Sequence, residues 1–87
     1  MLLDCIESEF GEGITRSKSY NGFLARVIFA HIAHKHINMI QKEIAAYIGR
    51  CRSDVAHMLT YVTKMDDDGI LAHSIRHIER EYLKRVR

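Results

Sequence analysis

Two apolar-patterned segments meet at a glycine in the middle of this chain, and their spacing constrains its fold more than any other feature. The first segment, residues 41–48, ends at Gly49, where a helix must stop and the backbone can take a positive φ. In that segment Ala45 follows the apolar Ile44. Two helices have to approach each other closely at this position, and a larger side chain would hold them apart. The second segment begins near Arg52, and its apolar residues recur at i, i+3, i+4 and i+7: Val55, Met58, Leu59 and Val62. The pattern predicts two helices joined by a short turn, with the spacing of a DNA-reading helix-turn-helix over about residues 41–65.

The second of these segments has a polar side opposite its apolar stripe. That side carries residue types that suit phosphates and base edges: Arg52, Ser53, His57, Tyr61 and Lys64. A helical hairpin that serves only core packing could also place an alanine and a glycine in these positions, so this remains the alternative.

The rest of the chain favours helices as well. None of its 87 residues is proline, so that every periodic segment can be helical. We predict an all-α fold, a small five-helix bundle in a single domain (1–87), with helices at about 2–10, 21–36, 41–48, 52–65 and 70–85. Residues 66–69 are expected to form a turn that caps the last helix. Besides the four apolar residues named above, the residues expected to face inward are Leu3, Ile6, Phe10, Leu24, Val27, Ile28, Ile32, Ile40, Ile44, Tyr47, Ile48, Leu71, Ile75, Ile78 and Tyr82.

Charge is distributed unevenly along the chain. The formal net charge is only +2, but residues 16–52 hold seven basic residues and one acid, Glu43, a local net of +6. The first dozen residues contain four acids and no base. This asymmetry suits a protein that faces a polyanion with one side, although a mixed, solvated surface would look similar. The last predicted helix also has a basic stripe: His73, Arg76, His77, Arg80, Lys84 and Arg87. We interpret it as the solvated side of a surface helix; the alternative is an edge that contacts phosphates.

Several kinds of site do not fit the sequence. The histidine pairs His31/His34 and His73/His77 have no cysteine or carboxylate at a zinc-like spacing, so no metal site is expected. Phosphate loops, nucleophile elbows and triad contexts are absent, so we expect neither an enzyme nor a cofactor. Cys5 and Cys51 fit two reduced thiols of a cytoplasmic protein. No apolar run reaches the roughly 20 residues of a membrane span, and no secretory signal is seen.

With these helices in place, the chain resembles the DNA-binding domain of the bacterial chromosomal replication initiator DnaA, which belongs to the same helical group as the Trp repressor. The resemblance covers most of the chain. Ala25-Arg26 matches the family's Ala-Arg helix opening, and Glu43-Ile44 matches the start of its next helix. Gly49-Arg50 and Val55, with His57 two residues later, match the frame of its Gly-Gly-Arg-Asp-His-Thr-Thr-Val signature.

The chain also departs from the family. The second glycine of the signature is missing, and the base-reading Asp-His-Thr segment is replaced by Cys51-Arg52-Ser53. Leu24 stands where the initiator usually has a basic residue for the minor groove, and the ATPase domain is absent. The resemblance therefore implies the fold and duplex binding, without ATPase activity and without recognition of the initiator's own DNA box.

These observations predict a prokaryotic or phage protein that binds double-stranded DNA in the regulation of replication or transcription. A protein partner or a homodimer is compatible with this prediction. The residues expected to contact DNA are Arg16, Lys18, Arg26, Lys42, Arg50, Arg52, Ser53, His57 and Tyr61. The alternative is a small helical protein-interaction module, for example from a phage or mobile element, that keeps the fold without binding DNA. In that case Tyr20, Phe23 and Phe29 would form a partly exposed docking patch.

Overall fold

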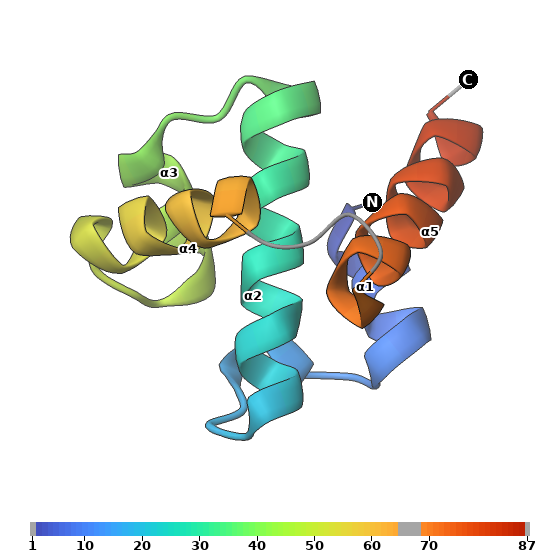
Figure 1. Ribbon diagram of the computed structural model, residues 1–87, viewed down its shortest axis with the longest axis horizontal. Coiled ribbons are helices and arrows are strands. Elements are labelled where there is room, and N and C mark those ends of the chain that lie inside the picture. Colours follow the sequence, from blue (N-terminus) through green and yellow to red (C-terminus); the bar gives the residue numbers. More distant parts are fainter. Residues whose placement is uncertain (1, 65–68, 87) are drawn as a thin grey trace.

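The computed structural model describes residues 2–64 and 69–86, and this part of the chain contains α-helices and no strand (Figure 1). The helices are α1 (Leu2–Phe10), α2 (Tyr20–Ile32), α3 (Gln41–Ile48), α4 (Arg52–Lys64) and α5 (Ile70–Arg85). A short 3-10 turn, η1 (Ile14–Arg16), precedes α2, and a π-helical turn, η2 (Ala33–Ile37), follows it. The predicted all-α class is confirmed, and the five expected helices appear close to their predicted bounds.

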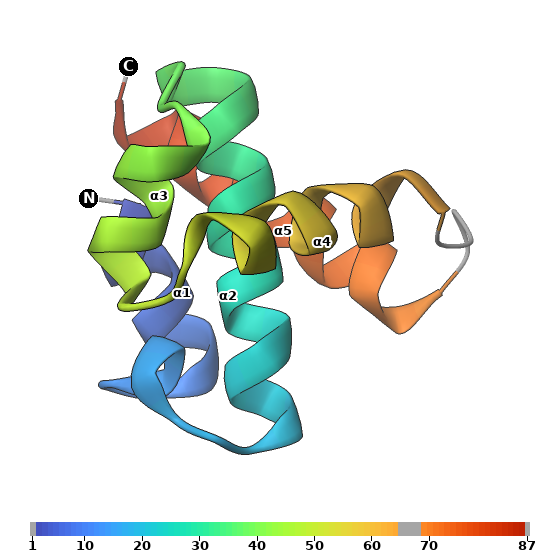
Figure 2. The ribbon, with the colours of Figure 1, turned by 90° about the vertical axis from the view of Figure 1, so that its left-hand side faces the viewer.

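Helix α2 is the centre of the fold. Every residue from Ala25 to Ala30 is buried, and so are Ile32 and Ala33. Figures 1 and 2 show α3 and α4 on one side of α2, and α1 and α5 on the other. A helix that is apolar around most of its circumference has to be enclosed in this way. One hydrophobic cluster consequently takes in residues of all five helices, including Ile6, Ile28, Ile44, Val55 and Ile78.

Both ends of α2 have a clear local cause. At its start, the Ser19 hydroxyl accepts a hydrogen bond from the Gly22 N–H at 3.2 Å, as a side-chain cap does. At its end, the helix expected to reach residue 36 widens into the π turn η2. Asn38 then takes a left-handed conformation with φ of 61°, which asparagine tolerates better than most residues. The N–H groups of Asn38 and Met39 both reach the Ala33 carbonyl and close the turn.

A tight turn joins α3 to α4. The Glu43 carboxylate accepts a hydrogen bond from the Ile40 N–H at 3.2 Å and fixes the start of α3. Gly49 ends α3 with φ of 68°, and the Arg50 N–H donates to the Ala45 carbonyl at 2.9 Å, in the manner of a Schellman motif. Ala45 is buried where α3 meets α4, as predicted.

Two residues expected in the core of α3 are exposed. Ile40 is 58% exposed and Tyr47 is 57% exposed, so both predictions are wrong. The buried arc of α3 passes through Ile44, Ala45 and Ile48, and α3 packs against α4. That arrangement leaves Tyr47 at the edge of the arc, where its ring stacks on Phe29 with centroids 5.3 Å apart.

Polar contacts connect α5 to the rest of the fold. The Glu79 carboxylate accepts a hydrogen bond from His36 Nε2 at 2.7 Å and lies 3.3 Å from Lys35 Nζ, while His77 Nε2 lies 3.2 Å from the Glu9 carboxylate of α1. Burial by itself would raise the pKa of Glu79, but the hydrogen bonds from His36 and Lys35 lower it below its ordinary value of 4.5. The turn predicted before α5 falls largely on residues 66–68, which lie outside the described residues.

The buried Gly22 provides a test of the packing at the start of α2. A Cβ built on Gly22 would overlap the backbone carbonyl of Ser17, so Gly22→Ala must displace the loop before α2. We expect a loss of about 1–3 kcal/mol in the free energy of unfolding, measured by urea denaturation, the usual cost of overpacking. The neighbouring exposed residue offers a matched control, since Asn21→Ala should cost much less; equal losses in the two variants would contradict this account.

Candidate nucleic-acid interface

Helix α4 lies on the outside of the fold and crosses α2 (Figures 1 and 2). Val55 and Met58 are buried against the core, and Leu59 and Val62 are partly buried on the same side. The residues predicted for the opposite side are all exposed: Arg52, Ser53, His57, Tyr61 and Lys64. Thr60 and Thr63 are exposed as well. Asp54 is the one acid among the residues of α4 that the structure describes.

The start of α4 is held by backbone contacts. The Cys51 carbonyl accepts hydrogen bonds from the N–H groups of Asp54 and Val55, at 3.1 and 3.3 Å. The Ser53 hydroxyl lies 3.2 Å from the Cys51 sulfur. Arg50 and Arg52 are exposed on either side of this junction, and neither forms an ion pair with any residue within 2–64 or 69–86. The positive end of the α4 dipole is therefore accompanied by two unpaired arginines.

The other basic residues of the predicted interface come from three different elements. Arg16 belongs to η1, Lys18 to the loop before α2, and Lys42 to the first turn of α3; all three are exposed. The exposure that phosphate contacts require is thus present at these positions.

Arg26 does not lie on the surface, and its predicted role as a DNA contact needs correction. It is only 5% exposed, and its Nη1 donates to the carbonyls of Thr15 at 3.1 Å and Ser17 at 2.6 Å. Burial, followed by the nearby charge of Arg50, lowers the pKa of Arg26, while Asp54 raises it. The guanidinium thus holds the η1 loop against α2, because it satisfies two backbone carbonyls there.

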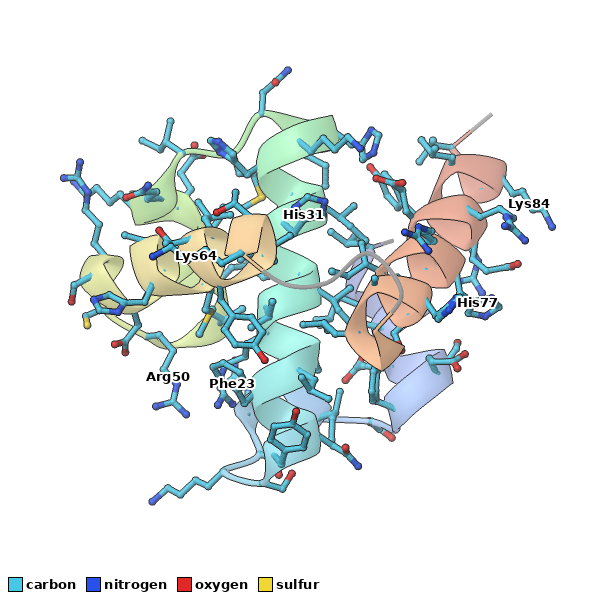
Figure 3. All side chains as sticks on the ribbon, viewed as in Figure 1. Phe23, His31, Arg50, Lys64, His77 and Lys84 are labelled. Carbon is cyan, nitrogen blue, oxygen red and sulfur yellow. The ribbon has the colours of Figure 1, made fainter. Side chains whose placement is uncertain are left out.

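A half-open cleft of about 470 Å³ runs along one flank of α4, toward the start of α2. Figure 3 shows Arg50 and Phe23 on this side of the helix. The Phe23 and Tyr61 rings meet edge to face, with centroids 5.6 Å apart. The cleft is lined by Phe23, Arg26, Arg50, Asp54, His57, Met58 and Tyr61. The sequence pattern did not reveal Phe23 and Met58 as lining residues. Helical periodicity indicates which side of a helix is buried, but not which residues lie at the edge of that side and border a cleft.

A second, shallower groove runs along the other flank of α4, beside the end of α2. Its walls include His31, Lys35 and Gln41 on one side and Thr60 and Thr63 on α4. The prediction missed the two threonines, whose hydroxyls donate to carbonyls of their own helix, at 3.0 and 2.7 Å. Burial, followed by the charge of Lys35, lowers the pKa of His31; Glu79 raises it, and His36 and His34 lower it further.

Other features bear less on this interface. The basic residues predicted along α5 are exposed at His73, Arg76, His77, Arg80 and Lys84. However, Lys84 lies 3.6 Å from Glu81, and His77 pairs with Glu9. Across the described ranges, no three histidine, cysteine or carboxylate side chains gather as a metal site would require. None of the helices in this part of the chain is long and apolar enough to cross a membrane.

Comparisons with protein-family models, with curated proteins and with solved structures find no match to this chain.

His31, in the groove beside α4, should make the free energy of unfolding depend on pH. Because the folded state lowers the pKa of His31 below its ordinary value of 6.5, the unfolded chain binds more protons as the pH falls. We expect the stability contributed by this residue to be present above about pH 6.5 and to be lost as the pH falls below that value. Replacing His31 by Gln should flatten the pH dependence of the urea midpoint in that window. An unchanged slope would contradict the assignment.

Proposed function

We propose that this protein binds double-stranded DNA through a helix-turn-helix formed by α3 and α4, similar to that of the DnaA DNA-binding domain and without ATPase activity. The observation that carries the proposal is the exposed polar side of α4, which starts between two arginines that have no ion-pair partner in the described part of the chain. An α-helix fits the major groove of B-DNA, and its N-terminal dipole favours phosphate.

In the proposed complex, the N-terminal end of α4 enters the major groove. Arg52 pairs with a guanine through two hydrogen bonds, a contact that contributes about 1–3 kcal/mol of discrimination. Ser53 and His57 contact base edges or phosphates further along the exposed side. Arg50, Arg16 and Lys18 contact the phosphate backbone, and Lys42 and Tyr61 extend the contact surface.

Arg26 has an indirect role in this proposal. Its two hydrogen bonds to the η1 loop fix the backbone between Thr15 and Ser17, and this places Arg16 and Lys18 beside the start of α2. Asp54 lines the same cleft as Arg26 and Arg50, where it offsets part of the charge of Arg26 and can accept a hydrogen bond from a cytosine amine. One small domain makes few phosphate contacts, so tight binding would need a second copy or a fused partner.

The salt dependence of binding tests this proposal directly. On random duplex DNA, measured by fluorescence anisotropy, we expect log K to fall with log salt with a slope of about −3.6 if four phosphates are contacted. Lys18→Ala should weaken binding to all duplexes alike and reduce this slope by about one. Arg52→Ala should instead relax base preference in a selection from a random duplex pool.

Arg80→Ala is a matched control for both variants. Arg80 is an exposed arginine of α5, on the other side of α2, so its loss should leave both the slope and the base preference unchanged. If Lys18→Ala and Arg52→Ala bind as well as the parent protein, the docking model is wrong.

A protein-interaction module remains the second candidate function, and one observation favours it. Several large apolar side chains between α2 and the end of α3 are exposed: Ile37 at 40%, Ile40 at 58% and Tyr47 at 57%. Ile37 and Tyr47 line one pocket. Of the patch predicted for this alternative, Tyr20 is 69% exposed but Phe29 is buried. An absence of duplex binding even at low salt would favour this function.

A further inference from the structure

The cleft between α4 and the start of α2 has a charged end and an apolar end, and duplex binding does not explain that combination. Its volume of about 470 Å³ falls within the range of small-molecule sites. Phosphate backbones are contacted on open surfaces by flexible basic side chains, whereas this cleft includes a buried arginine.

The charged end is formed by Arg26 and Arg50. Arg26 uses its Nη1 for two loop carbonyls, but its buried Nε has no hydrogen-bond partner among the described residues. Arg26 also lines the cleft, so that an anion bound there lies beside its guanidinium group. Arg50 is close enough to lower the pKa of Arg26, and Asp54 offsets one of the two positive charges. One net positive charge therefore remains at this end of the cleft.

The apolar end is formed by Phe23, Met58 and Tyr61. Met58 is buried and provides a flexible, polarizable surface. Phe23 is partly buried and Tyr61 is 42% exposed, and the two rings meet edge to face. Aromatic side chains on the wall of a cleft favour a flat ring as the ligand.

We infer that this cleft binds a small phosphorylated aromatic compound of the nucleoside monophosphate class. The phosphate lies between the guanidinium groups of Arg26 and Arg50, and the ring packs against Phe23 and Tyr61. Asp54 accepts a hydrogen bond from an amine of the ring. Binding of the ligand needs no DNA, so this site and the proposed duplex-binding function can each fail without the other.

The test is calorimetric titration of the full chain with AMP, adenosine and inorganic phosphate, in the absence of DNA. AMP should bind more tightly than either fragment, because only AMP contacts both ends of the cleft. Arg50→Gln should weaken AMP about tenfold, since it removes a charge-assisted hydrogen bond. Arg52→Gln, the same change of charge outside the cleft, should leave AMP binding unchanged. Tyr61→Leu should weaken AMP but not phosphate.

Three outcomes would overturn the inference. They are an absence of saturable AMP binding, equal losses in Arg50→Gln and Arg52→Gln, and phosphate binding as tight as that of AMP. Arg50 and Arg52 are both exposed, so neither variant removes a core contact. Arg26 is left intact throughout, because its replacement would also release the η1 loop.

Discussion

The enclosure of α2 is the constraint on which the rest of the structure depends. From Ala25 to Ala33 only His31 is even partly exposed, and so the other helices have to cover this helix from both sides. Helix α4 buries only a narrow stripe in doing so, with Val55 and Met58 at its centre. The polar side of α4 consequently remains exposed to solvent. A partner can therefore contact this helix without disturbing the core.

The same enclosure explains the position of Arg26. A guanidinium that enters a core needs acceptors, and the carbonyls of Thr15 and Ser17 provide them. This contact connects the core to the η1 loop, and Gly22 allows the loop to approach closely. The basic loop, the cleft and the start of α4 are therefore parts of one arrangement, in which a single buried side chain positions several exposed ones.

The sequence predicts the helices well because their boundaries depend on local chemistry: Ser19 and Gly49 act within a few residues of themselves. It also predicts the exposed side of α4, which follows from helical periodicity. It fails where tertiary packing decides. Tyr47 has the spacing of a core residue, but the buried arc of α3 runs through Ile44, Ala45 and Ile48. Arg26 has the character of a surface cation, but it is buried and hydrogen-bonded to the η1 loop. The cleft depends on distant residues such as Phe23 and Tyr61, whose contact no local pattern reveals.

The most direct measurement of the central claim is a map of backbone amide chemical shifts in the protein as duplex DNA is added. If α4 enters the major groove, the largest changes will lie at residues 50–64 and in the loop from Arg16 to Ser19, and the amides of α5 will change little. Changes confined to the surface around Ile37, Ile40 and Tyr47, or none at all at low salt, would contradict the claim that the exposed side of α4 binds DNA.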